Sequence, residues 1–359
     1  MELSPAFWAG RRVLLTGHTG FKGGWLGLWL QMLGAQVHGY ALPPPPAGDT
    51  PHALWHAARL HDAVTGTLAD VRDGERLHAA MAAFAPEIIL HLAAQPLVRA
   101  SYQAPIDTYA TNVMGTAHVL EAARRCTAVR AIVVVTSDKC YDNREWPWPY
   151  RETDALGGHD PYSSSKACVE LLCSSWRASF LQGAGIRLAT ARAGNVIGGG
   201  DAAPDRLVPD ALHTWERGAT LTLRHPGATR PWQHVLEPLG GYLLLAQALA
   251  QGDDSAASAW NFGPGAEGTA SVAAVIGELA RLWPGGLAAW RAEERPQPHE
   301  AGLLALDSSK SRHQLGWRPR WTLAQALART IDWYSASRTG ADMLAFTRAQ
   351  ITAFESSVP

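Results

Sequence analysis

The first half of the chain alternates short, continuously apolar segments with longer segments that have helical periodicity. The apolar segments predict strands at residues 12–15, 36–41, 87–92, 130–136 and 186–193. The segments between them predict helices at residues 23–33, 74–84, 108–126 and 164–181. Runs such as Ile132 to Val135 show no polar alternation, which is typical of parallel strands that are covered on both faces. The pattern predicts an α/β fold built on a doubly wound parallel sheet.

The texture of the sequence changes near Asn195. Glycine, proline and arginine become frequent at residues 198–206 and 224–232, which favours a smaller C-terminal portion that binds a substrate. The apolar segment at 259–264 is expected to return as a strand to the large sheet, so the two portions are interleaved. The predicted division is 1–194 for a nucleotide-binding domain with that returning strand, 195–338 mainly for substrate binding, and 339–359 for a C-terminal helical tail.

Composition narrows the class of protein. The formal net charge is −1 and 18% of the residues are charged, so nucleic acid and anionic membranes are not expected as partners. The N-terminus lacks the pattern of a secretory signal, and no apolar run approaches the roughly 18 residues of a membrane span. The 4 cysteines lack CxxC spacing and the 14 histidines lack metal-ligand spacing. We expect a cytoplasmic protein without a metal.

A glycine-rich turn joins the first predicted strand to the first long helix. Because Gly17, Gly20 and Gly23 lack Cβ atoms, the backbone can approach a pyrophosphate and the helix can lie close to the sheet. The N–H groups and dipole of that helix then favour an anion. Strand, turn and helix follow the order of a Rossmann dinucleotide site, and the alternative is a connector without a ligand. The residues expected to line the site are Gly17, Thr19, Gly20, Phe21, Lys22 and Gly23.

A second motif, Tyr162-Ser-Ser-Ser-Lys166, lies in a predicted helix. The tyrosine and lysine are four positions apart, so they share one helix face at a spacing of about 6 Å. An ammonium beside a phenol favours the phenolate, and we expect the pKa of Tyr162 to fall from about 10 toward neutral. Such a tyrosine can accept a hydroxyl proton while a nicotinamide accepts a hydride, and Ser137 at a strand end can hydrogen-bond the reacting oxygen. An ordinary surface pair is the alternative for Tyr162 and Lys166.

The glycine turn, the strand-end serine and the Tyr-x-x-x-Lys pair together resemble the extended short-chain dehydrogenase/reductase family. Ser137 is followed by Asp138 and Lys139, an acid and a base. Nucleotide-sugar 4,6-dehydratases of this family have such a pair, usually Asp-Glu, and the Asp-Lys form resembles the CDP-glucose 4,6-dehydratases. The further stretches that carry the resemblance are 91–99, 111–116, 193–201, 205–210, 230–237 and 315–319. The resemblance covers about Trp8 to Trp333.

The resemblance implies a hydro-lyase that converts CDP-D-glucose into CDP-4-dehydro-6-deoxy-D-glucose with bound NAD. Oxidation at C4 acidifies the C5 proton, which Lys139 removes, and Asp138 donates a proton to the departing C6 hydroxyl before the hydride returns to C6. These roles need a neutral Lys139 and a protonated Asp138. Nearby positive charge favours the neutral form of Lys139, and burial favours the protonated form of Asp138. The alternative for this pair is that the two residues only bind each other.

Other functions stay open at this point. One is a dehydratase, epimerase or oxidoreductase that acts on a UDP- or dTDP-sugar, and another is a non-catalytic nucleotide-sensing protein on the same fold. The choice of cytosine as the base rests on the resemblance alone. Relatives of this kind supply deoxysugars for bacterial surface polysaccharides, such as the O-antigen of lipopolysaccharide.

The resemblance also implies contacts to NAD. Asp70 and Val71 resemble the family's adenine contact, and the strand end Leu92-Ala93-Ala94 is expected to line the cofactor. Asn112 is a further expected contact, with a helix-surface position as the alternative. The second strand ends without the acidic residue that commonly binds the ribose 2′-hydroxyl, and without an arginine for a 2′-phosphate. We therefore predict NAD rather than NADP, held weakly enough that activity needs added cofactor.

The substrate contacts follow from the same likeness. Asn195 and Arg206 resemble the residues that hold the diphosphate of a sugar nucleotide, and Arg230 offers a bidentate fork to the same group. A solvated face is the alternative for both arginines. The stretch around His299 and Glu300 resembles the family's nucleotide rim. The helices predicted at 108–126 and 164–181 are expected to form a four-helix seam in a homodimer or dimer of dimers, unless they pack only on their own sheet.

Overall fold

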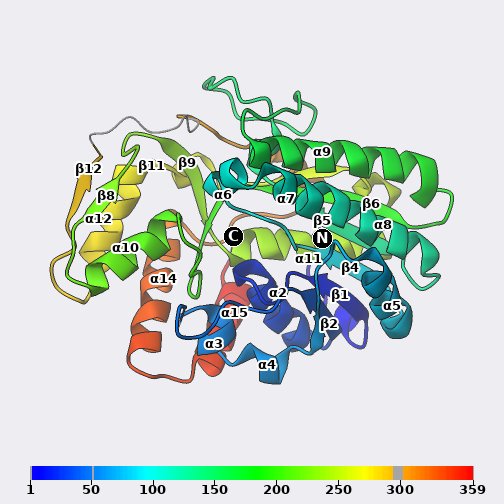
Figure 1. Cartoon of the computed structure of the whole chain (residues 1–359), viewed down its shortest axis with the longest axis horizontal. Coiled ribbons are helices and arrows are strands. Elements are labelled where there is room, and N and C mark those ends of the chain that lie inside the picture. Colours follow the sequence, from blue (N-terminus) through cyan, green and yellow to red (C-terminus); the bar gives the residue numbers. More distant parts are fainter. Residues whose placement is uncertain (1, 51, 294–301, 359) are drawn as a thin grey trace.

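The central sheet has seven parallel strands in the order β10-β6-β5-β4-β1-β2-β3 (Figure 1). The computed structural model describes residues 2–50, 52–293 and 302–358, so His299 and Glu300 lie outside it. The strands are β1 Arg12–Thr16, β2 Gln36–Ala41, β3 Gly66–Leu68, β4 Ile88–His91, β5 Ala131–Val135, β6 Arg187–Ala193 and β10 Ala259–Phe262. The predicted doubly wound sheet is confirmed, and β10 does return to it beside β6.

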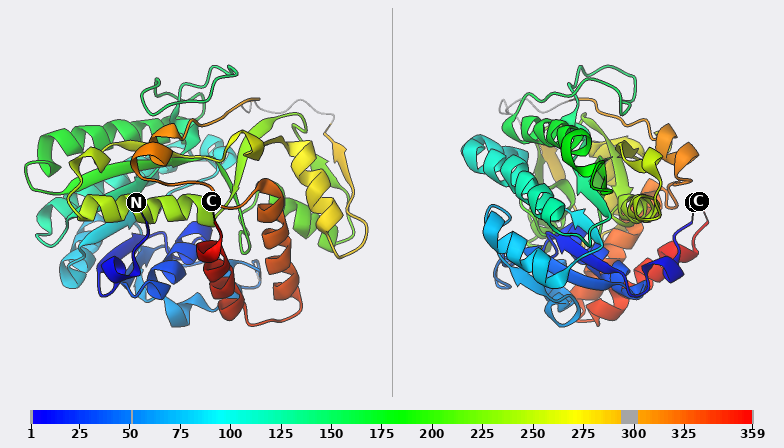
Figure 2. Two further views of the ribbon diagram at one scale, coloured as in Figure 1. Left: turned by 180° about the vertical axis from the view of Figure 1, so that it is seen from behind. Right: turned by 90° about the vertical axis from the view of Figure 1, so that its right-hand side faces the viewer.

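Helices cover both faces of this sheet (Figures 1 and 2). The helices of one face are α5 Gly74–Phe84, α8 Gly115–Arg125 and α9 Pro161–Trp176. The helices of the other face are α2 Phe21–Met32 and α11 Leu236–Ala250, with α15 Met343–Ser356 packed against α2. Because side chains alternate along a strand, Ile132 packs toward α8 and α9 while Val133 packs toward α11.

The remaining portion sits beyond the carboxyl ends of the strands. A three-stranded sheet joins β7 Asn195–Ile197, β9 Thr229–His234 and β11 Thr269–Ser271 in the order β11-β9-β7. A two-stranded parallel sheet pairs β8 Leu221–Leu223 with β12 Trp290–Ala292. The longer helices of this portion are α10 Leu207–Glu216, α12 Val272–Leu282 and α14 Leu323–Arg338. These elements lie to one side of the large sheet, at the left of Figure 1.

The shorter elements connect these layers. The short α-helices are α1 Pro5–Trp8, α3 Leu54–Ala57, α4 Leu60–Ala63, α6 Val98–Gln103, α7 Pro105–Tyr109 and α13 Ser309–Gln314. The 3₁₀-helical segments are η2 Asp138–Cys140, η4 Asp254–Ala256 and η5 Ala266–Gly268. The π-helical segments are η1 Ala110–Met114 and η3 Arg177–Leu181. The helix predicted over 108–126 therefore consists of α7, the π-helical segment η1 and α8 in succession. Periodicity alone did not reveal the π-helical segment. The short strand β3 was not among the predicted strands.

Candidate active site

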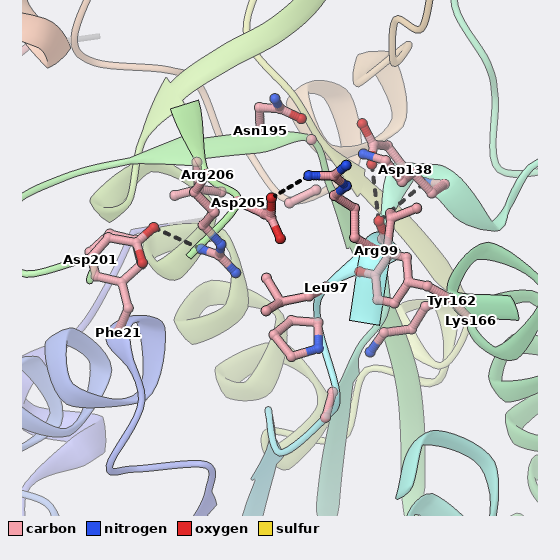
Figure 3. A pocket seen from close by; sticks show the side chains of 18 of the residues that line it. Phe21, Leu97, Arg99, Asp138, Tyr162, Lys166, Asn195, Asp201, Asp205 and Arg206 are labelled. Carbon is pink, nitrogen blue, oxygen red and sulfur yellow. Dashed lines mark hydrogen bonds and ion pairs between the residues drawn. The ribbon is translucent and has the colours of Figure 1, made fainter. Parts of the chain in front are cut away.

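One large cavity opens at the carboxyl ends of β1, β4 and β5, with a volume of about 980 Å³. It is the edge at which open parallel sheets bind ligands. Residues from the sheet, from β7 to β9 and from α10 line it, so both portions of the chain contribute (Figure 3). The predicted residues that line it are Gly17, Thr19, Gly20, Phe21, Lys22, Gly23, Asp70, Val71, Leu92, Ala93, Ala94, Ser137, Asp138, Lys139, Tyr162, Lys166, Asn195, Arg206 and Arg230.

The glycine turn has the shape that a dinucleotide needs. Gly17 has φ +78°, and a Cβ there would lie 2.8 Å from the backbone nitrogen of Ala93. A Cβ on Gly23 would overlap the carbonyl of Gly17. The helix α2 starts at Phe21 without a side-chain cap from Gly20, so its first N–H groups face the cavity mouth unpaired by a cap. These features fit the pyrophosphate of NAD.

Two hydrogen-bonded loops line the side of the cavity where the contact to adenine was predicted. The carboxylate of Asp70 accepts hydrogen bonds from the backbone N–H and guanidinium of Arg72. The bond to the Arg72 side chain lowers the pKa of Asp70. At the end of β2 the cavity wall is formed by Ala41 and Leu42. The carbonyl of Leu42 accepts a hydrogen bond of 2.9 Å from the hydroxyl of Thr19. An apolar wall at that point suits neither an extra phosphate nor tight binding of the ribose.

Ser137, Asp138 and Lys139 leave strand β5 as a 3₁₀ turn rather than as extended chain. The Oγ atom of Ser137 caps this turn by accepting the N–H of Lys139 at 3.2 Å, and it donates to Oδ1 of Asp138 at 3.0 Å. Because the turn curls back, the two residues after Ser137 both line the cavity. No ion pair joins Asp138 to Lys139 in the described part of the chain, so the two side chains do not simply bind each other.

Asp138 stands out in its surroundings. Its side chain is buried, and its Oδ2 atom has no hydrogen-bond partner among the described residues. A buried carboxyl oxygen without a partner is costly unless a ligand or a proton satisfies it. Asp138 therefore combines an unpartnered carboxyl oxygen with a place in the cavity wall, where it is predicted to act as an acid.

The helix α9 carries Tyr162 and Lys166 into the same cavity. Its N-cap Asp160 accepts the N–H of Ser163 at 2.9 Å, and Pro161 occupies the first helical position, so the helix starts one residue before the tyrosine. The N–H of Tyr162 donates to Ser101 at 3.1 Å, and Nζ of Lys166 donates to the carbonyl of Val135 at 3.2 Å. Both side chains are buried.

The expected neutral-range tyrosine is wrong for the protein without cofactor. Burial raises the pKa of Tyr162 to about 12, and the hydrogen bond between Tyr162 and Ser137 offsets this only in part. Burial also lowers the pKa of Lys166 to about 8, which weakens the ammonium that was expected to acidify the phenol. The sequence shows that the pair is four residues apart, but not that both members are removed from water.

A buried ion pair between Glu170 and Arg192 lies next to the end of β5 that leads into Ser137. Glu170, one helical turn after Lys166, accepts two hydrogen bonds of 2.9 Å from Arg192 and one of 2.7 Å from Thr190. It also accepts a hydrogen bond from Thr136, the neighbour of Ser137. Burial alone would raise the pKa of Glu170, but these hydrogen bonds hold it below its usual value. This network joins α9, β5 and β6 beneath the site, and the sequence reasoning did not single it out.

Arg206, one of the residues predicted to bind the substrate, lies across the cavity from Tyr162 (Figure 3). Nη1 of Arg206 binds Asp201 at 2.8 Å, and the coulombic attraction of that carboxylate raises the pKa of Arg206. Arg230 is buried and its Nη1 donates to the carbonyl of Thr229 at 3.0 Å. Neither arginine belongs to a solvated outer face, since both line the cavity.

Asn112 does not reach the cavity, so the structure does not support it as a direct cofactor contact. Its Oδ1 accepts the N–H of Gln95 at 2.8 Å, and its Nδ2 donates to Ser165 at 2.9 Å. The amide is therefore fully engaged in tying the loop after β4 to the helix α9. It is not a helix-surface residue either, because it is buried.

Several charged residues of the cavity were not among the predicted site residues. Arg99, Asp201, Asp205 and Asp210 all line it. Burial raises the pKa of Asp210 to about 6, and the neighbouring Asp205 adds to this effect. Each of these residues lies inside a stretch that carried the family resemblance, but no spacing rule distinguishes them from surface charges.

The described residues contain neither a candidate metal site nor a candidate membrane span. No group of three or more His, Cys, Asp or Glu side chains in that part of the chain could hold a metal ion. No described helix combines the length and apolar character needed to cross a bilayer. The 4 cysteines are free thiols.

Comparison with known proteins places this site among nucleotide-sugar enzymes. Residues 14–330 match the family model described as GDP-mannose 4,6 dehydratase. The CDP-glucose 4,6-dehydratase of Salmonella typhimurium is 49% identical over 98% of this chain and 98% of its own, and the dTDP-glucose 4,6-dehydratase of Streptomyces antibioticus is 30% identical over 77% and 78%. A dTDP-glucose 4,6-dehydratase structure from Streptomyces venezuelae, solved with NAD, superposes with a TM-score of 0.77 at 24% identity, over 93% of this chain and 99% of that one.

Proposed function

The chain belongs to the GDP-mannose 4,6-dehydratase family, and from that premise we propose that it removes water from CDP-D-glucose to give CDP-4-dehydro-6-deoxy-D-glucose. In this proposal it is a hydro-lyase of the extended short-chain dehydrogenase/reductase type with NAD as its cofactor. The observation that carries the proposal is the convergence of Asp138, Lys139, Tyr162 and Lys166 on one cavity that also contains the glycine turn. A dehydrogenase needs only the last two of these side chains, whereas the elimination of water needs an added acid and base.

The chain supplies four functions around the sugar. Tyr162 takes the proton of the C4 hydroxyl, with Ser137 holding that oxygen in place. NAD, when bound, supplies the hydride acceptor for C4 and the hydride donor for C6, and its positive charge works against the raised pKa of Tyr162. Lys139 then removes the C5 proton, and Asp138 protonates the departing C6 hydroxyl. Water leaves, C6 regains the hydride, and Lys139 returns to C5 the proton that it took, so the cofactor would be regenerated and the net reaction is a dehydration.

The test is product analysis by NMR after the protein is mixed with NAD and CDP-glucose. We expect a C6 methyl group and a C4 ketone in the product. The variants Asp138→Asn and Lys139→Met should stop methyl formation, because each removes one proton carrier of the elimination. An epimerase would instead give CDP-galactose, and its turnover would be indifferent to both substitutions. Either result would replace the dehydratase proposal.

The nucleotide is the part of the proposal that rests most on likeness. Its support is the 49% identity to a CDP-glucose enzyme over nearly the whole chain. Competition among CDP-, dTDP- and UDP-glucose at equal concentration tests it, and we expect CDP-glucose to be consumed first. Because the wall at Leu42 offers the ribose no acidic partner, we expect turnover to rise when NAD is added to purified protein.

We further propose that the protein is a cytoplasmic homo-oligomer, a dimer or a dimer of dimers. The apolar side chains Ile106 in α7, Met114 in η1 and Leu171 in α9 are exposed, and these three elements pack against one another. Burial of such a patch favours pairing of two copies. Light scattering after size exclusion tests this, and Leu171→Glu should shift a dimer toward monomer.

We also propose the division of the chain into 1–194, 195–338 and 339–359, which limited proteolysis tests. The product of the reaction would supply deoxysugars for surface polysaccharides.

A further inference from the structure

Two arginines converge on one carboxylate in the substrate half of the cavity. Nη1 of Arg99, in α6, lies 3.0 Å from Oδ1 of Asp205, in the loop before α10. Nη1 of Arg224, after β8, lies 3.7 Å from the same oxygen. Arg206, expected to hold the diphosphate of the substrate, follows Asp205 directly in the chain. Three arginines from three separate segments therefore line the same cavity, and two of them lie at the carboxylate of Asp205.

Asp205 differs from the other aspartate of this wall. Asp201 is almost fully buried and accepts hydrogen bonds from the backbone of Ala203 and from Arg206, so it is a fixed part of the site. Asp205 has a left-handed backbone, with φ +59°, and 39% of its side chain is exposed. An ion pair with that exposure contributes little to stability, and its members can return to water at low cost.

We propose that Asp205 is an internal stand-in for the substrate diphosphate, and that Arg99 is a diphosphate-binding residue that Asp205 neutralises until the substrate arrives. This inference rests on the proposed function, because it takes a nucleoside diphosphate as the ligand. Figure 3 shows Arg99 between Asp205 and the group formed by Asp138 and Tyr162. A guanidinium at that place can bind the phosphate next to the sugar while Arg206 binds from the opposite side.

The exchange has a clear physical basis. A carboxylate and a phosphate oxygen offer the same acceptor geometry to a guanidinium, so one can replace the other without moving the arginine far. A diphosphate carries more negative charge than one carboxylate and can bridge two arginines at once. The carboxylate that it displaces is already near water. In the ligand-free protein Asp205 keeps Arg99 and Arg224 from repelling each other across the cavity.

The experiment measures calorimetric binding of CDP, UDP and dTDP to wild-type protein and to two variants. Asp205→Asn removes the competing charge, and asparagine tolerates the left-handed backbone at least as well as aspartate. We expect this variant to bind the preferred diphosphate about fivefold more tightly. Arg99→Gln should bind it about tenfold more weakly, the loss expected for one charge-assisted hydrogen bond.

A matched ion pair elsewhere provides the control. Arg187 binds Asp254 at 2.7 Å outside the cavity, and Arg187→Gln should leave binding of all three nucleotides unchanged. The inference is overturned if Asp205→Asn binds the diphosphate no more tightly than wild type, or if Arg99→Gln binds as wild type does. Circular dichroism of each variant shows whether it has folded.

Failure of the proposed function gives a different pattern. If wild type prefers UDP or dTDP to CDP, the proposed substrate is wrong, but the ratios between variants still report on Asp205 and Arg99. If wild type dehydrates CDP-glucose while both variants bind CDP as wild type does, the proposed function stands and this inference falls. If no diphosphate binds to wild type, both are wrong.

Discussion

The two walls of the cavity are built in different ways. On the sheet wall, defined by Ser137, Tyr162 and Lys166, each side chain is buried and hydrogen-bonded: Ser137 to Asp138, Tyr162 to Ser137, and Lys166 to the carbonyl of Val135. On the lobe wall, the part of the cavity formed by the C-terminal portion and defined by Asp205 and Arg206, these two charged side chains are partly exposed; Asp205 pairs with Arg99, and Arg206 pairs with the buried Asp201. Burial shifts pKa values and fixes geometry, which proton transfer requires. Exposed ion pairs exchange partners at little cost, which suits the capture of an anion.

The comparison implies that changes in the sheet wall should alter the chemical step, whereas changes in the lobe wall should alter binding. The largest effect is expected for Tyr162→Phe. Because this substitution removes the only proposed carrier of the C4 proton but keeps the ring, kcat should fall about 10³-fold or more. The measurement is steady-state turnover with saturating CDP-glucose and NAD. A change confined to KM would place Tyr162 with the binding residues.

The second prediction concerns the support of the sheet wall. Glu170→Gln leaves the buried Arg192 without its counter-charge, so the free energy of unfolding should fall by about 3 kcal/mol. Urea unfolding measures it. Glu121→Gln is the control, because Glu121 pairs with Arg124 and Arg125 on the surface of α8, where such a pair contributes well under 1 kcal/mol. Equal losses in the two variants would show that Glu170 has no special structural role.

The third prediction uses the lowered pKa of Lys166, about 8 in the folded protein against 10.5 in the unfolded chain. Between these values the unfolded chain binds more protons, so this residue makes stability rise with pH from about 8 to 10.5. Below pH 8 its full cost is present. Lys166→Met should therefore abolish turnover yet raise the free energy of unfolding at pH 7, by about 2 kcal/mol after the lost hydrogen bond is counted.

The pH dependence provides the check on that third prediction. The advantage of Lys166→Met over wild type in urea unfolding should shrink as the pH is raised from 8 toward 10.5. A variant that is less stable than wild type at pH 7 would show that Lys166 stabilises the sheet wall instead of straining it. The buried lysine would then be a structural residue as well as a functional one.

How far the sequence could go also differs between the walls. The sheet wall follows from local patterns: an apolar strand, a serine at its end and a Tyr-x-x-x-Lys helix turn, all of which the structure brings to the cavity. Local patterns do not report burial, however, and this is why the pKa of Tyr162 was predicted in the wrong direction. They also did not reveal that the side-chain amide of Asn112 is hydrogen-bonded to Gln95 and Ser165.

The lobe wall was harder to predict because its contacts join segments far apart in the chain. Arg99 and Asp205 are 106 residues apart, and nothing in either neighbourhood indicates the other. The structure supplies what the sequence lacks here, namely which charges share one volume. Family likeness predicted Arg206 and Arg230 as substrate-binding residues, but the ion pair of Arg206 with Asp201 was visible only in three dimensions.

The smallest predicted effect is the one that separates the walls most directly. Arg206→Lys keeps the positive charge and the ion pair with Asp201, so the fold should be preserved, but it loses the planar fork that binds two phosphate oxygens. KM for CDP-glucose should rise about tenfold, a change of about 1.4 kcal/mol, with kcat within about twofold of wild type. Steady-state kinetics measures both constants on one preparation. If kcat falls as far as KM rises, Arg206 also positions the sugar against Tyr162, and the assignment of chemistry to one wall and binding to the other fails.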